Sequence, residues 1–435
     1  MRFLIAAIVV TALAAGALLG GVVRESRSAG PVPPTSAFQA ESLRSEFGSG
    51  DTVSLLRRLQ EEARARPDSA QTKALLGLAY AQRARETGDA AYYLRSEAVL
   101  RRARELEPKN TYALTGLGGL ALARHRFADA LAIGREARIA APSSAAPFGI
   151  VGDALVELGR YDEAFAAFDR MAALKPNASS YSRISYAREL TGDVAGAIET
   201  MELAVDASIG RPEASAWSAV ELGKLHWSVG RVTAAAASFR LALVFVPGYA
   251  PALDALARVE AARGRTKQAI ALQRRAVEAI PLPHLVAQLG DLLAVAGRPV
   301  EAQEQYALVG AIERLQIANG VETDLETALF RIDHGIRLRD TLTLARAARA
   351  ARPSVLGDDV LAWALVRNGR CAEARIASVR SLRLDQRDAS FFFHRGMIER
   401  CLGNGAAART WFARALDLNP NFSILWAPVA RKAVA

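Results

Sequence analysis

The side chains that most often perform chemistry are few in this sequence of 435 residues, and they stand far apart. Two cysteines are present, together with five histidines at His125, His226, His284, His334 and His394. No His-Glu-x-x-His motif, Cys-x-x-Cys pair, Gly-x-Ser-x-Gly elbow or phosphate-binding P-loop occurs. Those motifs mark metal sites, hydrolases and nucleotide-binding enzymes. We therefore expect a non-catalytic protein that binds neither a metal nor a cofactor.

The overall composition is that of a folded protein. Apolar residues make up 51% of the chain and charged residues 23%, which excludes wholesale disorder. Two cysteines are too few for a disulfide-dense scaffold. The length exceeds what one compact core supports, so the chain forms either several domains or an elongated array.

Positive charge is concentrated in the last part of the chain. The net charge is +10, and residues 331–435 hold 18 basic against 9 acidic side chains, whereas residues 31–330 are nearly neutral. Only 6 of the 55 basic residues are lysines. Because a guanidinium group binds carboxylates and phosphates through two parallel hydrogen bonds, this arginine-rich third is a candidate surface for an anionic partner. The alternative is that the arginines merely cover solvated helix faces. No basic and aromatic RNA-binding motif accompanies them, so we expect no nucleic-acid binding.

An apolar segment begins the chain. Residues 3–23 carry no charge, and as a helix they would span about 31 Å, the thickness of a bilayer core. Ala15-Gly16-Ala17 fits a signal-peptidase site, but cleavage there would leave residues 18–23 as an apolar new terminus. We therefore expect residues 1–23 to act as an uncleaved signal anchor rather than a cleaved signal peptide. Residues 24–50 would form a flexible tether, with the remainder outside the cytoplasm, in the periplasm or cell envelope.

A period of 34 residues runs through the rest of the sequence. Pro108, Pro142 and Pro176 follow one another at this spacing, and so do Pro247 and Pro281. Glycines and alanines elsewhere keep the same interval. A fixed period of this length indicates an array of stacked structural units.

The residues that recur with this period resemble those of the tetratricopeptide repeat family, in its bacterial membrane-anchored or exported form. Leu76-Gly77-x-x-Tyr80 carries the first half of the family pattern. An Ala-x-x-x-Phe segment followed by a proline carries the second half, at residues 164–176, 235–247 and 408–420. The resemblance covers residues 51–420 as about nine repeats.

This resemblance implies an all-α fold, a right-handed superhelical solenoid of helix-turn-helix repeats. Single residues support it: Gly159 suits the left-handed turn between two helices, and Pro176 ends the second helix. Gly152 and Ala164 are small enough for the two helices to approach closely. One hairpin cannot bury its own apolar face, so we expect each to lean on its neighbours and the stack to curve into a cradle. Residues 421–435 would form a capping helix.

The family resemblance also implies that the first helices of the repeats line a concave groove, which binds a peptide or helix of a protein partner. Projecting each first helix by its period predicts which residues face the groove. These are Tyr112, Asp153, Trp217, Lys224, Trp227, Asp254, Arg258, Asp291, Trp363, Phe393 and Arg400.

Two tryptophans are the strongest candidates for contacting a partner. Trp217 and Trp227 are ten residues apart, close to three helical turns, so they point the same way, with Lys224 between them. Tryptophan and arginine dominate binding hot spots. The alternative is that both rings pack between helices. The Lys/Asn clamp by which chaperone-binding members of the family hold a peptide carboxylate is missing, which argues against a co-chaperone.

The two cysteines fall in consecutive repeats. Cys371 opens the second helix of one repeat and Cys401 ends the first helix of the next, so stacked hairpins place both on the same edge. If the chain is exported, a disulfide can join them. Two unpaired thiols are the alternative. A disulfide requires the two Cα atoms to lie within about 7 Å.

These observations favour a membrane-anchored, non-catalytic scaffold that holds a protein partner in its groove. An envelope component that binds an anionic polymer or glycan through the arginine-rich C-terminal third is the alternative, and its binding would weaken steeply with salt. An accessory subunit that stabilises an enzyme complex would have the same sequence features.

Overall fold

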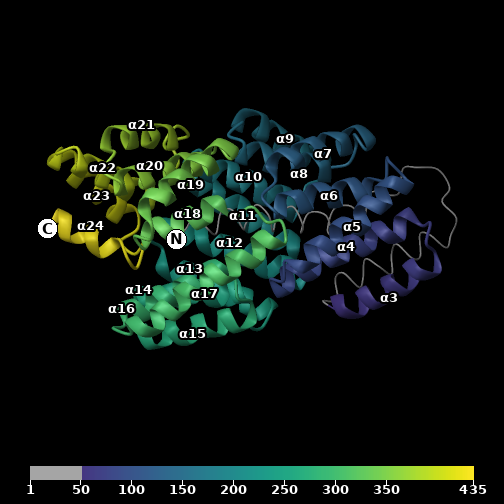
Figure 1. The fold of residues 1–435 in the computed structure, drawn as a ribbon, viewed down its shortest axis with the longest axis horizontal. Coiled ribbons are helices and arrows are strands. Elements are labelled where there is room, and N and C mark those ends of the chain that lie inside the picture. Colours follow the sequence, from purple (N-terminus) through teal and green to yellow (C-terminus); the bar gives the residue numbers. More distant parts are fainter. Residues whose placement is uncertain (1–50) are drawn as a thin grey trace.

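The computed structural model describes residues 51–435, which form 22 α-helices and no β-strand (Figure 1). The all-α repeat fold is therefore confirmed. The anchor expected at residues 1–23 and the tether expected at residues 24–50 lie outside the described residues. Among the helices of residues 51–435, none has both the length and the hydrophobicity of a membrane-spanning helix.

Twenty of these helices pair into ten antiparallel hairpins. The hairpins are α4 (Ala70–Thr87) with α5 (Ala91–Leu106), α6 (Thr111–Ala123) with α7 (Phe127–Ala140), α8 (Ala146–Glu157) with α9 (Tyr161–Leu174), α10 (Ala178–Leu190) with α11 (Val194–Ser208), α12 (Pro212–Ser228) with α13 (Val232–Phe245), α14 (Ala250–Ala262) with α15 (Thr266–Ala279), α16 (Pro283–Val295) with α17 (Pro299–Ala318), α18 (Asp324–Asp333) with α19 (Leu338–Ala351), α20 (Val355–Arg367) with α21 (Cys371–Ser381), and α22 (Ala389–Cys401) with α23 (Gly405–Leu418). Helix α3 (Thr52–Ala65) precedes them, and α24 (Ala427–Val434) follows them.

The described residues thus hold one hairpin more than the nine or so that the period suggested. Helix α17 extends to 20 residues and α18 shortens to 10, so the hairpin of α18 and α19 falls out of the 34-residue phase. Its turn holds two residues with positive φ, Gly335 at 69° and Arg337 at 44°.

In four of the ten hairpins a glycine of the first helix faces an aromatic ring of the second. A Cβ atom on Gly152 would lie 2.3 Å from the ring of Phe168, and one on Gly223 would lie 2.3 Å from the ring of Phe239. The same pairing, always sixteen residues apart, recurs at Gly290 with Tyr306 and at Gly396 with Phe412. Because the first helix carries no side chain at this point, the ring of the second helix packs directly on its backbone.

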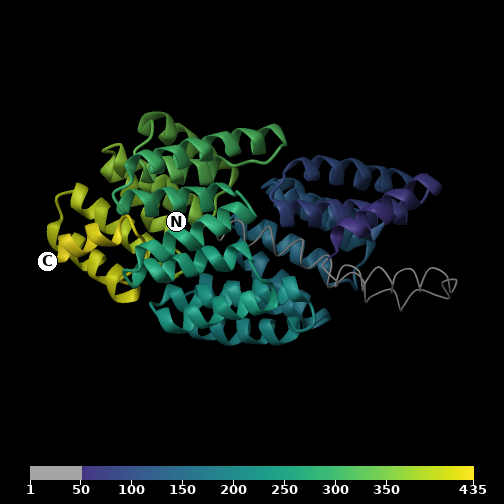
Figure 2. The same ribbon diagram turned by 90° about the horizontal axis from the view of Figure 1, so that it is seen from below.

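The stack curves so tightly that its later hairpins lie against its earlier ones (Figure 1 and Figure 2). Four turn glycines with positive φ meet a loop about 190 residues further along the chain. A Cβ atom on Gly159 would lie 2.4 Å from the carbonyl oxygen of Pro353, and one on Gly192 would lie 2.6 Å from that of Asp385. A Cβ atom on Gly230 would lie 3.3 Å from the carbonyl oxygen of Leu418, and one on Gly88 would lie 2.7 Å from the side chain of Ile280. We call this row of contacts between successive superhelical turns the seam.

Buried polar groups reinforce the seam at its centre. Arg352, at the end of α19, is 5% exposed and donates to Glu157 at 2.6 Å and to Glu326 at 2.7 Å. The backbone N–H of Val355 donates to the hydroxyl oxygen of Tyr161 at 2.7 Å. Each of these contacts except Arg352 with Glu326 joins residues almost 200 positions apart. Their burial means that water does not compete with them.

Further polar contacts extend the seam to both sides. The guanidinium of Arg124 donates to the carbonyl oxygen of Gly320 at 2.9 Å, and the side-chain amide of Asn419 donates to that of Trp227 at 2.8 Å. The hairpins thus stack into the expected solenoid, and they also contact hairpins of the next superhelical turn, which the expected cradle did not include. The loops that join the two helices of a hairpin contain glycines. Because glycine has no side chain, the next superhelical turn packs directly on the backbone of these loops.

Candidate partner-binding cavity

A cavity of about 150 Å³ lies on the concave side of the first helices α8, α10, α12 and α14. The N-terminal ends of α20 and α22, which belong to the next superhelical turn, close it from the opposite side. Aromatic rings form much of its wall. They come from Tyr161, Tyr186, Trp217, Trp227, Phe239 and Phe391.

Five of the eleven predicted groove residues line this cavity together: Trp217, Lys224, Trp227, Asp254 and Arg258. The ring of Trp217 is partly exposed, whereas Trp227 is only 6% exposed and also packs in the core between α12, α13 and α14. Trp227 therefore packs between helices and also forms part of the cavity wall.

Two of the cations that line the cavity are paired with acids on their own helices. Lys224 Nζ lies 2.6 Å from Glu221, and Arg258 donates to Asp254 at 2.8 Å. Burial raises the pKa of the Glu221 carboxyl, and the charge of Lys224 offsets this only in part. Burial lowers the pKa of the nearby His284 to about 4, although the negative charge of Asp254 acts to raise it. The imidazole is therefore neutral at pH 7. The wall also holds Arg387 and the carboxyl groups of Glu157, Glu189 and Asp388, so acidic side chains outnumber basic ones around the cavity.

Two predicted groove residues serve the packing of the solenoid instead. Asp153 is 2% exposed and accepts two hydrogen bonds, at 2.8 and 2.6 Å, from the guanidinium of Arg183 on α10. Asp291 is 1% exposed and accepts from Tyr306 at 2.9 Å and from His334 at 2.7 Å. Predicting them as groove residues was wrong, because side chains of neighbouring helices donate hydrogen bonds to both carboxylates and cover them.

The histidine beside Asp291 shows how tightly that carboxylate is held. Burial alone would lower the pKa of His334, but the hydrogen bond to Asp291 and its negative charge outweigh burial and raise it. The ring also packs against Tyr306, with 4.5 Å between ring centroids. This cluster joins α16, α17 and α18 and is closed to a partner.

Trp363 and Phe393 lie on inner helices but are fully buried, at 0% exposed each. The chain itself covers them, because the segment 421–426 after α23 folds over α18, α20 and α22. The ring of Trp426 stacks on Phe393 at 5.7 Å, and the indole N–H groups of Trp363 and Trp426 both donate to one oxygen of Asp333 at 2.9 Å. Assigning these two rings to a partner was wrong, since the capping segment already occupies that part of the groove.

The remaining two predicted groove residues lie away from the cavity. Tyr112 is half-buried and packs beside Ala74 and Ala113, near the N-terminal end of the solenoid. Arg400 is exposed at the C-terminal end of α22. The structure does not bring either of them together with Trp217.

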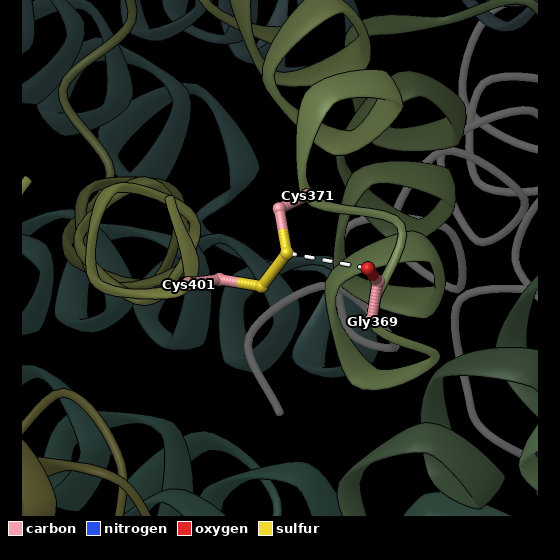
Figure 3. Close-up of a disulfide and its surroundings, with 3 residues drawn as sticks. All are labelled: Gly369, Cys371 and Cys401. Atoms are coloured by element: carbon pink, nitrogen blue, oxygen red, sulfur yellow. Dashed lines mark hydrogen bonds between the residues drawn. A yellow bond between two sulfur atoms is a disulfide. The ribbon is translucent and has the colours of Figure 1, made fainter. Parts of the chain in front are cut away.

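A disulfide joins Cys371 at the start of α21 to Cys401 at the end of α22 (Figure 3). Their Cα atoms are 5.8 Å apart, within the range that a disulfide needs. Cys371 is half-buried and Cys401 is exposed. The bond ties the ninth hairpin to the tenth.

Comparison with known proteins identifies the fold. The tetratricopeptide repeat model matches residues 93–145, 151–212, 220–282 and 360–421, more than half of the chain in all. The chain belongs to the tetratricopeptide repeat family. Members of this family are generally non-catalytic and bind protein or peptide partners, so the protein is a protein-interaction scaffold.

Individual relatives are distant. Human tetratricopeptide repeat protein 36 is 42% identical over 76 residues, which cover 17% of this chain and 40% of that protein, well short of its full length. Among solved structures, the APC/C hetero-tetramer Cut9-Hcn1 is 16% identical over 92% of this chain and 85% of its own, with a TM-score of 0.39. YrrB, described as a tetratricopeptide repeat protein with an unusual peptide-binding site, is 18% identical over 43% of this chain and 94% of its own, with a TM-score of 0.29. Pseudomonas aeruginosa pilF is 19% identical over 49% and 93%, with a TM-score of 0.36.

Several cavity residues of this tetratricopeptide repeat protein escaped prediction. Tyr186 belongs to a first helix, in a repeat whose consensus is weak. Val355 and Phe391 reach the cavity from the next superhelical turn, and Tyr161 from the start of a second helix. No local pattern marks them, because their place in the cavity depends on how far the whole superhelix rotates before it closes on itself.

Proposed function

We propose that this protein is a membrane-anchored scaffold that binds a segment of a partner protein by taking one apolar side chain of that segment into the cavity beside Trp217. The observation that carries the proposal is the cavity itself. Its volume of about 150 Å³ suits one aromatic or aliphatic side chain, since an engineered apolar cavity of that size holds a benzene molecule.

The chemistry of the wall supports the same occupant. Trp217 and Trp227 offer flat apolar surfaces of the kind that dominate binding hot spots. The ion pairs of Lys224 with Glu221 and of Arg258 with Asp254 add donors and acceptors for the backbone of an extended segment. Because acidic side chains outnumber basic ones in the wall, a strongly acidic segment is disfavoured.

Two features support a location at the membrane and outside the cytoplasm. The uncharged residues 3–23 are long enough for a membrane anchor. The disulfide between Cys371 and Cys401 is of a kind that persists in oxidising compartments and is rare in the cytosol. The scaffold would thus hold its partner at the membrane surface of the cell envelope.

The test is site-specific photo-crosslinking of the full-length protein in intact cells. A photoreactive phenylalanine analogue replaces Trp217 in one strain and the exposed Arg240 of the outer helix α13 in another. We expect a discrete crosslinked species from position 217 only. The same set of species from both positions would contradict binding in the cavity.

Substitution then measures the contribution of the ring. Trp217→Ala should lower recovery of the captured partner at least tenfold, corresponding to about 1.4 kcal/mol of binding free energy. Val244→Ala, a truncation of a side chain that is 75% exposed on α13, serves as the control and should leave recovery unchanged. Full recovery with Trp217→Ala would mean that the partner binds elsewhere.

A further inference from the structure

We propose that the outward side of α19, α21 and α23 docks on a bilayer surface rich in anionic phospholipid. The centre of this surface is α21, with Arg375, Ile376, Val379 and Arg380, and arginines of α19 and α23 flank it. We call it the arginine face. It lies on the second helices of the last three hairpins, so it leaves the cavity of the inner helices α8 to α14 free.

A local excess of positive charge adjoins this face where α19 and α21 end at the seam, and there Arg383 also donates to the carbonyl oxygen of Pro353. The carboxylate of Asp358 is 1% exposed and accepts from Arg349 at 3.0 Å, from Arg380 at 3.0 Å and from Arg383 at 2.8 Å. One negative charge therefore serves three positive ones. The three guanidinium side chains remain 34%, 41% and 32% exposed, so two net charges face the solvent.

Burial increases the charge excess of the whole C-terminal third. Of its 18 basic side chains, only Arg352 and Arg395 are buried. Of its nine acidic side chains, Asp358, Asp359 and Glu399 are buried. The surface of residues 331–435 therefore has a larger surplus of basic over acidic side chains than the sequence of this segment has. A positive surface attracts anionic lipid headgroups.

Exposed aliphatic side chains distinguish a bilayer from a soluble polyanion. Ile376 is 60% exposed and Val379 is 58% exposed, and their spacing of three residues places both on one side of α21, between Arg375 and Arg380. A glycan or an anionic polymer in water gains little by covering them. At a bilayer the aliphatic groups enter the headgroup boundary while the arginines pair with phosphate.

The structure holds α21 firmly enough for this role. The disulfide of Cys371 with Cys401 fixes its first residue to α22, and Arg346 of α19 forms an ion pair with Glu373 of α21 at 3.4 Å. On α23, the guanidinium of Arg414 lies 4.2 Å from the ring centre of the half-buried Trp411. The same ring packs on Phe392 of α22, with 5.6 Å between ring centroids, and so holds α23 against α22.

The test measures how close the face comes to the bilayer in the full-length protein reconstituted in vesicles. A polarity-sensitive fluorophore is attached to the new thiol of a Val379→Cys variant. In a second sample it is attached to a Val244→Cys variant, which is reconstituted in the same way but carries the fluorophore on α13, outside the arginine face. Both native cysteines are engaged in the disulfide, so only the new thiol reacts. The vesicles contain phosphatidylcholine alone or mixed with phosphatidylglycerol.

At position 379 we expect a blue shift and quenching by nitroxide-labelled lipid, in the phosphatidylglycerol vesicles only. High salt should abolish the signal, since about 1 M salt shortens the screening length to roughly 3 Å. Position 244 should show no change in either vesicle. An equal response at both positions, or no dependence on phosphatidylglycerol, would overturn the proposal.

Variants that remove positive charge identify which arginines bind the phosphatidylglycerol vesicles. Replacing Arg339, Arg375 and Arg409 together by Gln should weaken the phosphatidylglycerol-dependent signal roughly fivefold for each arginine that reaches the surface. These three side chains are exposed, and circular dichroism melting checks that the variant folds. A triple variant that keeps the full signal would overturn the proposal.

The matched control removes the same charge from other outer helices, by replacing Arg135, Arg170 and Arg240 with Gln. It should leave the signal unchanged. Ile376→Ser should reduce the quenching, because the aliphatic contact is lost. If Ile376→Ser has no effect while soluble dextran sulfate competes fully, the partner of the face is an anionic polymer and the lipid assignment is wrong.

Discussion

The backbone N–H of Val355 donates a hydrogen bond of 2.7 Å to the hydroxyl oxygen of Tyr161, which precedes it by 194 residues. Both residues are buried, and burial raises the pKa of Tyr161 despite the bond from Val355, so the hydroxyl stays protonated. Tyr161 opens the second helix of the third hairpin, and Val355 opens the first helix of the ninth. The stability of the solenoid therefore depends on contacts between its superhelical turns as well as between neighbouring repeats.

Removing this hydroxyl should cost stability. Tyr161→Phe keeps the ring but leaves the buried N–H of Val355 without its acceptor, so we expect a loss of about 1–3 kcal/mol in the free energy of unfolding by urea. Tyr92→Phe on α5, where the ring contact with Tyr80 is kept, is the control and should change stability by less than about 0.5 kcal/mol. Equal effects of the two substitutions would show that the seam contributes nothing.

A pair of glycines isolates the contact between the turns from backbone strain. Gly159 and Gly264 both have positive φ, at 70° and 75°, so alanine at either costs about 1 kcal/mol of backbone strain. A Cβ atom on Gly159 also meets the carbonyl oxygen of Pro353, whereas one on Gly264 meets nothing within 4 Å. Gly159→Ala should therefore destabilise by about 1–3 kcal/mol more than Gly264→Ala. Identical denaturation curves would mean that the turns are apart in solution.

The buried ion pairs of Arg352 make a third prediction. Arg352→Met leaves the carboxylates of Glu157 and Glu326 buried without their cation, and we expect a loss of about 3–5 kcal/mol. A triple variant that also carries Glu157→Gln and Glu326→Gln removes the unpaired charges and should recover most of that loss. The same measurement on both variants checks the cause. A triple variant as unstable as the single one would point to lost packing instead.

Acid should weaken the seam through Glu97. Burial alone would raise the pKa of this carboxyl, but hydrogen bonds from Arg101 and Arg124 bring it from 4.5 to about 2. Because the folded pKa lies below the unfolded one, the stabilisation is present above about pH 4.5 and is lost as the pH falls through about 2. Arg124 also donates to Gly320 across the seam, so hydrogen exchange near residue 320 should accelerate first.

The control for this prediction is Glu97→Gln, which no longer titrates. Its free energy of unfolding should fall less steeply between pH 5 and pH 2 than that of the unmodified protein. The same steepness in both would assign the acid sensitivity to other groups.

The disulfide gives the fifth prediction. It closes a loop between residues 30 positions apart, so replacing both Cys371 and Cys401 by Ser should lower the free energy of unfolding by about 3 kcal/mol. A reductant should have the same effect on the unmodified protein and none on the double variant. A reductant that leaves the unmodified protein unchanged would contradict a role of this bond in stability.

Local chemistry made the hairpins and part of the cavity predictable. The pairing of Gly152 with Phe168 depends only on residues within one repeat. The shared direction of Trp217, Lys224 and Trp227 depends only on the helical period, and the structure places all three in the cavity wall.

Non-local packing explains what the sequence did not reveal. Trp363 and Phe393 satisfy the same period, but Trp426 covers them from another part of the chain. The approach of Gly159 to Pro353 results from small rotations summed over six repeats. Such a sum is sensitive to each step, so no single motif predicts it.

The seam changes how the molecule should come apart. In an ordinary repeat array each unit depends only on the one before and the one after it, so the ends fray first and unfolding spreads along a line. Here a hairpin also contacts one that is five or six hairpins away along the chain. Unfolding of one hairpin should therefore destabilise the hairpin of the next superhelical turn that packs on it. We expect thermal unfolding to be a single cooperative transition rather than a gradual loss of hairpins from the ends.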